Sequence, residues 1–222
     1  LDNDQVAQSS AHHGIPKQTG RTTCRHERCV ATHFDDGPEP DTTPKVLDAL
    51  KQQGAPATFF VLGNKVGKQQ AIIRRTQDEG HELGNHSWAH ANFTKLRPDQ
   101  MQAELDQTNR ALADAGVRPT RLFRPPYGAL NRKVTDAVKT PIILWNTDPK
   151  DWKTSDSSSQ EIATVVGSVH PGAIVLMHDT KANTAVSLPE IIKQLRAAGY
   201  KLVTVSQLLE LSGVSQGIYY GR

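Results

Sequence analysis

The stretch C-V-A-T-H-F-D-D-G-P, residues 29–38, sets the fold expected for the whole chain. Its apolar beginning predicts a buried strand over residues 30–34, and the Gly-Pro pair at its end predicts a turn. Between them stand two adjacent acids, Asp35 and Asp36, preceded by His33. Neighbouring carboxylates repel when both are charged, so they form a solvated turn, a pair with divided chemical tasks, or part of a metal site.

Strand-like and helix-like segments alternate along the rest of the chain. Apolar runs predict further strands over residues 57–62, 81–84, 121–123, 142–145, 173–177 and 201–205. Helical periodicity predicts helices over residues 43–53, 69–79, 98–115, 131–138, 159–169 and 188–198. Such alternation is typical of a parallel α/β domain with right-handed crossovers. It favours a distorted (β/α) barrel of seven to eight parallel strands, and an open doubly wound sheet also fits the pattern.

The domain organisation follows from where this alternation begins and ends. No linker-like stretch interrupts residues 24–212, so we expect a single domain there. Residues 1–23 are polar and lack apolar periodicity, which predicts an extended N-terminal arm. Residues 213–222 are expected to form a C-terminal tail.

Composition narrows the class of partner. The net charge of +3 comes with no dense block of Lys and Arg, so no nucleic-acid partner is expected. No run approaches the roughly 20 apolar residues of a membrane span, and an export signal is expected to have been removed or never present. Cys24 and Cys29 could close a small disulfide loop, with two free thiols in a cytosolic protein as the alternative. The cysteine pair favours secretion. The protein is expected to be a monomer.

Chemically reactive residues follow five of the predicted strands. They are Asp35 and Asp36, His86 and His90, Arg124 with the P-P-Y-G after it, Asp148 and Asp151, and His178 with Asp179. The loops after parallel strands gather on one face of such a fold and build its active site. The sequence therefore predicts one site assembled from five distant segments.

The two histidines of H-S-W-A-H, His86 and His90, are spaced four residues apart. One helical turn would place both imidazoles on the same face, where they could share a cation. Exposed or capping histidines are the alternative for such a pair taken alone. A carboxylate from the acid pair completes a set of two His and one Asp, leaving positions open for water and substrate.

A metal at this place gives the adjacent acids separate tasks. One carboxylate can bind the metal, whose charge relieves the repulsion and lowers the pKa of bound water. The other, left free, can take a proton from that water as it attacks a carbonyl. His178 could protonate the leaving group if Asp151 or Asp148 orients it, and otherwise it satisfies backbone groups at a strand end. Arg124 could pair with one of the acids or form a structural salt bridge.

Five short motifs stand in a fixed order along the chain. They are F-D-D-G-P at 34–38, H-S-W-A-H at 86–90, R-P-P-Y-G at 124–128, D-P-K-D-W at 148–152 and L-M-H-D at 176–179. In this order they resemble the motifs of the polysaccharide deacetylases of carbohydrate esterase family 4, also called the NodB homology domain. The resemblance covers residues from about 28 to about 210, and five motifs in order are very specific.

The resemblance implies a catalytic domain over residues 24–212 that binds one divalent metal, usually zinc and sometimes cobalt or another transition metal. By motif position, Asp36, His86 and His90 are implied as the metal ligands. Asp35 is implied as the catalytic base, held in place by Arg124.

The remaining motifs imply the other catalytic and substrate-binding groups. His178 is implied as the general acid, with Asp151 tuning it. The backbone N–H of Tyr127 is implied to help stabilise the tetrahedral oxyanion. The Tyr127 side chain, Trp152 and Leu176 are implied to line the substrate pocket around the acetyl methyl group.

Two departures from the family pattern bear on this site. Residues 131–141 are short for the helix and turn that usually precede the fourth motif. His33 stands where family members usually have Thr. We favour a buried strand histidine with a backbone partner, because strand alternation turns His33 away from Phe34. Contact with substrate or a nearby carboxylate and a fourth metal ligand are the alternatives.

The function implied is a metal-dependent N-deacetylase. Its expected substrate is a polysaccharide or oligosaccharide that contains N-acetylglucosamine, such as peptidoglycan or chitin, and acetate is released. An O-acetyl esterase acting on acetylxylan is the nearest alternative. A catalytically silent carbohydrate-binding protein is disfavoured because the whole set of implied catalytic residues is present. A serine hydrolase is disfavoured because no G-x-S-x-G motif occurs. Because the pair Cys24 and Cys29 favours secretion, a secreted or cell-wall-associated enzyme is expected.

Overall fold

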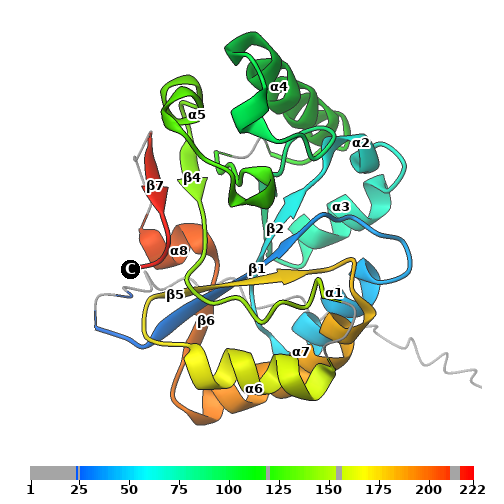
Figure 1. The fold of residues 1–222 in the computed structure, drawn as a ribbon. Helices are drawn as coiled ribbons and strands as arrows, with labels where there is room; N and C mark the ends of the chain where they lie inside the picture. Colours follow the sequence, from blue (N-terminus) through cyan, green and yellow to red (C-terminus); the bar gives the residue numbers. More distant parts are fainter. Residues whose placement is uncertain (1–23, 25, 119–120, 154–156, 211–215) are drawn as a thin grey trace, which may run out of the picture.

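The structure, a computed structural model, describes residues 24, 26–118, 121–153, 157–210 and 216–222. Figure 1 shows the order of the elements along the chain. The arm predicted over residues 1–23 lies outside the described residues. Within the described part of the chain, no helix combines the length and the apolar character needed to cross a bilayer.

A five-stranded parallel sheet carries the fold, with β1 (Cys29–Asp35) at its centre. Around β1 lie β2 (Thr58–Val61), β3 (Glu82–Asn85), β5 (Ala173–His178) and β6 (Lys201–Val203). β5 pairs along nearly all of β1, whereas β2 and β6 pair with its later and earlier parts, and β3 extends the sheet beyond β2. Every residue of β1 is buried. A parallel strand covered on both faces reads as an apolar run, which explains why the sequence predicts this strand so clearly.

A second, two-stranded parallel sheet pairs β4 (Pro141–Ile143) with β7 (Gly217–Tyr219). The predicted strand over 121–123 is wrong in extent: only Phe123 pairs, through isolated bridges to Asn85 and Ile142. Prolines follow at 125 and 126, and a proline has no backbone N–H with which to continue a ladder. Residues 217–219 of the expected C-terminal tail form β7.

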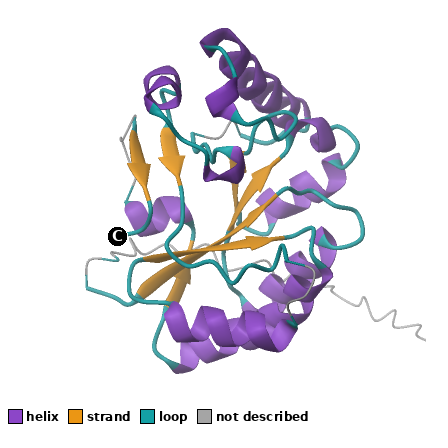
Figure 2. Cartoon of the chain, viewed as in Figure 1, coloured by secondary structure: helices purple, strands orange, loops and turns teal. Residues whose placement is uncertain are grey.

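Helices cover the outside of the strands (Figure 2). They are α1 (Thr43–Gln53), α2 (Gly63–Val66), α3 (Gln70–Asp78), α4 (Pro98–Asp114), α5 (Arg132–Ala137), α6 (Ser158–Ser168), α7 (Ala182–Ala197) and α8 (Val205–Leu209), with short 3-10 turns η1 (Phe93–Lys95) and η2 (Pro126–Gly128). α7 begins six residues before the predicted start at 188, because Thr184 and Ser187 are buried on its inner face and extend the helix. The main apolar cluster lies between the sheet and helices such as α1 and α7.

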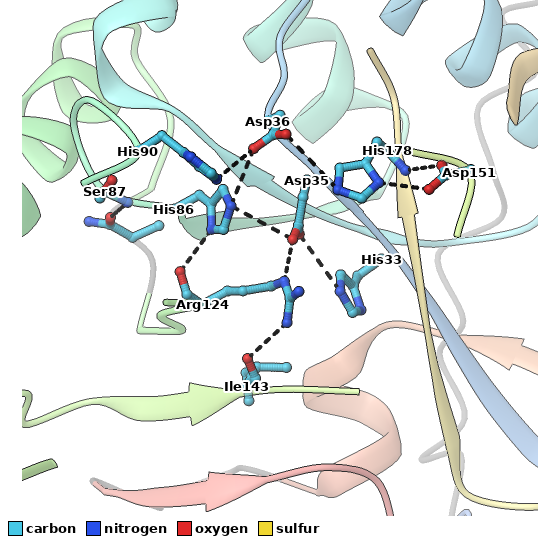
Figure 3. A network of polar contacts seen from close by, with 11 residues as sticks. His33, Asp35, Asp36, His86, Ser87, His90, Arg124, Ile143, Asp151 and His178 are labelled. Carbon is cyan, nitrogen blue, oxygen red and sulfur yellow. Dashed lines mark hydrogen bonds and ion pairs between the residues drawn. The ribbon is translucent and has the colours of Figure 1, made fainter. Parts of the chain in front are cut away.

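The expected α/β class with parallel strands is confirmed. Closure into a barrel of seven to eight strands stays a prediction. Isolated bridges carry the pairing from β3 through Phe123 to β4, and Thr147 forms a bridge with Val175 of β5. The described residues thus form two sheets joined by single bridges, and the carboxyl end of β1 faces the loops that hold the predicted site residues (Figure 3).

Candidate metal centre and active site

The two adjacent acids at the end of β1 differ in their nearest partners, although both lie within 4 Å of His86 (Figure 3). Asp35 is the last residue of the strand and is buried. Asp36 adopts a left-handed backbone conformation, with φ of 72°, which breaks the strand and turns its side chain elsewhere. Asp35 pairs with Arg124, and Asp36 lies against His86 and His90. The backbone thus separates two carboxylates that are neighbours in sequence.

Asp36, His86 and His90 form a group whose ligand atoms all lie within 4.8 Å of one another. Asp36 Oδ1 is 3.3 Å from Nε2 of each histidine. The same oxygen is buried and has no hydrogen-bond partner among the described residues. His86 Nδ1 donates to the backbone carbonyl of Arg124 at 2.8 Å, so the lone pair of Nε2 faces the other two ligand atoms. The donor set and its unsatisfied oxygen fit a divalent cation such as zinc.

The route by which the two histidines meet differs from the expected helical turn. Residues 86–90 form a loop in which Ser87 and His90 have positive φ angles of 72° and 57°. The carboxylate of Glu104 accepts hydrogen bonds from the backbone N–H groups of Trp88 and Ala89, at 2.9 Å each. A glutamate from α4 therefore holds the loop that brings the imidazoles together, and the helical prediction for this motif is wrong.

Asp35 is held by Arg124, whose Nε donates to Asp35 Oδ2. Burial opposes ionisation of Asp35, but the positive charge of Arg124 outweighs it and holds the pKa of this carboxyl below its usual value. The guanidinium carbon of Arg124 lies over the ring of Trp145, 4.2 Å from the ring centroid. Arg124 is itself buried, so the pair is shielded from solvent and Asp35 stays charged.

His33 lies beneath Asp35 and is fully buried. Its Nε2 is 3.7 Å from Asp35 Oδ1, and neither ring nitrogen has a hydrogen-bond partner among the described residues. The favoured interpretation of a backbone partner is therefore wrong, and the contact with a nearby carboxylate is what the structure contains. Burial and the charge of Arg124 keep the pKa of His33 well below its usual value, so the ring is neutral.

His178 ends β5 and faces the acids from the opposite side of the site. Its Nδ1 donates to Asp151 Oδ1 at 2.8 Å, and its backbone N–H donates to Asp151 Oδ2 at 2.7 Å. Burial lowers the pKa of His178, but the hydrogen bond and charge of Asp151 more than offset this and raise the pKa to about 9. His178 Nε2 lies 4.0 Å from Asp36 Oδ2. A protonated imidazole thus stands across the site from the base candidate.

One cavity of about 380 Å³ connects these groups. It is lined by Asp35, Asp36, His86, His90, Arg124, Tyr127, Trp145, Asp148, Trp152, Leu176 and His178. Every residue implied by the family motifs as a metal ligand, a catalytic group or a substrate-binding group lines it except Asp151, which lies behind His178. Asp179 does not line the cavity either, and it accepts a hydrogen bond from Thr43 Oγ1 at 2.5 Å. The side chains of Tyr127 and Trp152 are 66% and 47% exposed, which suits surfaces that meet a substrate.

Sequence reasoning missed Trp145 as a site residue. It lines the cavity and covers Arg124. An aromatic residue at the end of a predicted strand, three residues before Asp148, was the available signal. The predicted role of the Tyr127 N–H in stabilising an oxyanion stays a prediction.

Fold and site together define an α/β protein with a candidate Asp-His-His cation site between a buried carboxylate and a His–Asp pair. Residues 22–141 match the family model described as polysaccharide deacetylase. The chain therefore belongs to the polysaccharide deacetylase family, and the resemblance to carbohydrate esterase family 4 is confirmed.

Individual relatives give the breadth of the likeness. The chain is 41% identical over 180 residues to the peptidoglycan-N-acetylglucosamine deacetylase PgdA of Listeria monocytogenes, covering 81% of this chain and 38% of that protein. A solved T48 deacetylase with substrate superimposes with a TM-score of 0.84 at 37% identity, covering 89% of this chain and 99% of that one. A family 4 acetyl xylan esterase from Clostridium thermocellum, solved with a cobalt ion, has a TM-score of 0.81 at 34% identity and covers 87% of this chain and 98% of that one.

Proposed function

We propose that this chain is a metal-dependent N-deacetylase that removes acetyl groups from N-acetylglucosamine residues of a polysaccharide and releases acetate. The observation that carries the proposal is the Asp36-His86-His90 group facing both Asp35 and His178 across one cavity. Membership of the polysaccharide deacetylase family and the likeness to a peptidoglycan deacetylase support the same activity. Zinc is the proposed metal, because two imidazoles and one carboxylate are a set it commonly takes.

Asp36, His86 and His90 would hold the cation, which supplies a Lewis acid for the acetyl carbonyl and lowers the pKa of the water that attacks it. Asp35 carries out the first proton transfer. The positive charge of Arg124 keeps the Asp35 carboxyl ionised. The carboxylate can therefore accept the proton of the attacking water. Because Arg124 also fixes the orientation of the carboxylate, the base is preorganised before substrate binds.

His178 performs the second proton transfer. Collapse of the tetrahedral carbon breaks the C–N bond, and the nitrogen must gain a proton to leave as an amine. The raised pKa keeps His178 protonated at neutral pH, and the Asp151 bond at Nδ1 leaves Nε2 directed at the cavity. Water supplies one oxygen of acetate, and the acetyl carbonyl supplies the other. The substrate nitrogen leaves with two hydrogens, one its own and one from His178.

Peptidoglycan or chitin-type oligosaccharides are the proposed substrates. The exposed rings of Tyr127 and Trp152 at the mouth of the cavity support a sugar polymer, since aromatic faces supply large apolar contact area. A second candidate is O-acetyl ester hydrolysis on acetylxylan, supported by the likeness to an acetyl xylan esterase. The two share base and metal, but an ester's alkoxide depends less on the general acid than an amine does.

Acetate release from a panel of peptidoglycan, chitin oligomers and acetylxylan tests the proposal. We expect release from N-acetylglucosamine polymers that stops when a chelator strips the metal and returns when zinc is added. Asp36→Ala should stay inactive after zinc is added. Activity that persists in metal-free protein or in Asp36→Ala would overturn the metal mechanism. Turnover of acetylxylan alone would favour the second candidate.

We also propose that the protein acts as a monomer in an oxidising compartment outside the cytoplasm. The Cys24–Cys29 disulfide supports this location, because disulfides persist mainly in secreted proteins. Thiol alkylation of the native protein recovered from culture medium and from cell fractions tests this location. Free thiols on the native protein, or recovery only from cytosol, would contradict the location, and light scattering of the purified chain reports its oligomeric state.

A further inference from the structure

Asp179 is a buried carboxyl that the proposed reaction does not use. It directly follows His178, the last residue of β5, and is only 1% exposed. Its Oδ2 accepts a hydrogen bond from Thr43 Oγ1 at 2.5 Å. Its Oδ1 is buried and has no hydrogen-bond partner among the described residues. Burying a carboxyl with one oxygen unsatisfied costs free energy, so its presence at this place calls for a reason.

The Asp179 carboxyl lies directly against the turn that carries the candidate metal ligand Asp36. A Cβ built on Gly37 would lie 2.1 Å from Asp179 Oδ2, 2.5 Å from Oδ1 and 2.6 Å from the carboxyl carbon. All three atoms therefore pack on the Cα of Gly37, in space that any other residue would fill with its own Cβ. Glycine is thus what permits this close approach, and Asp36 is its neighbour in the chain.

Thr43, the first residue of α1, fixes the orientation of the Asp179 carboxyl. The Thr43 hydroxyl donates its hydrogen to Asp179 and accepts from the backbone N–H of Glu39 at 2.8 Å. Because a hydroxyl has a single hydrogen to give, these two bonds set its direction. The turn is tied down as well, since the Gly37 carbonyl accepts from the backbone N–H of Leu62 at 2.9 Å. The carboxyl is therefore held between the turn and the start of α1.

Strand pairing stops just before the two groups that face each other across the site. The register of β1 with β5 ends at the pair Asp35 and His178, and Asp36 leaves the strand with its φ of 72°. One residue beyond that pair, the Asp179 side chain connects the end of β5 to the turn after β1. The connection bears on the site, because His178 Nε2 lies only 4.0 Å from Asp36 Oδ2 (Figure 3).

We propose that Asp179 is a positioning residue: its carboxyl, packed on Gly37 and bonded to Thr43, sets where Asp36 stands relative to His178. This inference rests on the proposed function, which assigns Asp36 to the metal and His178 to the leaving group. Asp179 does not line the cavity, so its effect passes through the backbone of the turn. A carboxyl that served only the stability of the loop would leave the metal affinity of the folded protein unchanged.

The zinc affinity of the folded protein, measured by competition with a chromogenic chelator, tests the proposal without any substrate. Asp179→Ala should bind zinc about 10-fold more weakly, as is typical when an outer partner of the ligands is lost. Burial raises the pKa of Asp179 to about 7, and Oδ2 can accept from Thr43 whether the carboxyl is charged or neutral. Asp179→Asn keeps this acceptor and the shape, so it should bind zinc nearly as the wild type does. Unchanged affinity in Asp179→Ala, or equal losses in both variants, would overturn the proposal.

Thr43 gives a second route to the same answer. Thr43→Val removes the donor to Asp179 and should weaken zinc binding, whereas Thr43→Ser keeps the hydroxyl and should restore it. Thr76→Val is the matched control, because it removes a buried hydroxyl that donates to the Ile72 carbonyl at 2.8 Å on α3, and α3 contributes no residue to the cavity. Its zinc affinity should stay unchanged. Equal affinities in the two Thr43 variants would refute the proposal, and this pair decides if Asp179→Ala fails to fold.

Urea unfolding of metal-free protein tests the packing of Asp179 on Gly37. Gly37→Ala meets the carboxyl in the wild type, but in Asp179→Ala the three atoms nearest to the new Cβ are gone. The glycine substitution should therefore destabilise the wild type more than it destabilises Asp179→Ala, as expected for residues in contact. Equal losses in the two backgrounds would refute the packing on which the proposal stands.

Kinetics at saturating zinc separate this inference from the proposed function. Asp179→Ala should lower kcat on N-acetylglucosamine oligomers and leave KM near the wild-type value, because the residues that line the cavity are intact and only their relative placement changes. A normal kcat with a raised KM would overturn the inference. If the wild type turns over no polymer while zinc affinity follows the variants as expected, the proposed function alone fails. Turnover with zinc affinity indifferent to Asp179 and Thr43 would reject the positioning role alone.

Discussion

Replacing Arg124 with methionine removes the charge that keeps buried Asp35 ionised. Both side chains are buried, so water cannot take the place of the guanidinium, and Asp35 must either stay as an unpaired charge or take up a proton. Keeping a carboxyl with an ordinary pKa of about 3.9 protonated at pH 7 costs about 4 kcal/mol, at about 1.4 kcal/mol per pH unit. Loss of one partner of a buried pair costs about 3–5 kcal/mol, so both estimates give a loss of about 4 kcal/mol.

The pH dependence gives this prediction its sign. In Arg124→Met the folded-state pKa of Asp35 lies above its unfolded value, so the variant loses stability as pH rises and regains it as pH falls. We therefore expect the deficit relative to wild type to shrink from about 4 kcal/mol at pH 7 to about 1.5 kcal/mol at pH 5. Urea unfolding of chelator-treated protein, followed by circular dichroism at both pH values, measures the two deficits.

Two further variants isolate the charge from the packing. Arg124→Lys keeps the charge but loses the contacts of the guanidinium with Trp145 and the backbone carbonyl of Ile143, and should cost only about 1 kcal/mol. Arg124→Met combined with Asp35→Asn has no buried charge to satisfy, so it should be more stable at pH 7 than Arg124→Met alone. A deficit that is the same at both pH values, with additive single and double variants, would refute the reasoning.

The other predictions concern the metal, a close contact and a buried histidine. Dialysis against a chelator should abolish deacetylation, and metal analysis after reloading should find one zinc per wild-type chain and far less in Asp36→Ala. Gly37→Ala would place a Cβ 2.1 Å from Asp179 Oδ2 and should lower the free energy of unfolding, measured in urea, by about 1–3 kcal/mol. In the control Gly67→Ala the new Cβ would meet nothing within 4 Å, so the free energy of unfolding should stay unchanged. Equal effects of the two substitutions would contradict the clash. Burial lowers the pKa of His81 to about 4, so unfolded protein binds more protons below pH 6.5 and stability should fall by about 2–3 kcal/mol toward pH 4. His81→Asn should flatten this slope, and an unchanged slope would assign it to other groups.

Much of the fold was predictable because buried parallel strands read as apolar runs. β1, β2 and β5 are buried along their whole length, and apolar residues occupy most of their positions. β7 escaped prediction because it is a short edge strand whose residues are only partly covered, and such a strand lacks the apolar signal. The loop form of H-S-W-A-H also escaped prediction, because Glu104, which holds the loop, lies outside the motif on α4.

Most of the candidate site was predictable for a related reason. The reactive side chains directly follow strands, so their convergence at one edge of the sheet needed only the direction of the strands. The partners of Asp179 carried no such signal, because Thr43 lies 136 residues away in the sequence and reads as the first residue of a helix. Their contact depends on how the turn after β1 packs against the end of β5, which is a tertiary fact that local periodicity does not contain.

His33 shows how one rule of strand geometry can be applied to the wrong neighbour. Alternation does turn His33 away from Phe34, but the same period of two puts it on the face of Asp35. There the neutral ring lies 3.7 Å from Asp35 Oδ1, while Arg124 pairs with Oδ2. The unprotonated state matters, because a second positive charge beside Arg124 would compete for the same carboxylate and weaken it as a base. A buried neutral imidazole therefore leaves Arg124 as the main positive partner of Asp35, and this is compatible with the proton transfer proposed for that acid.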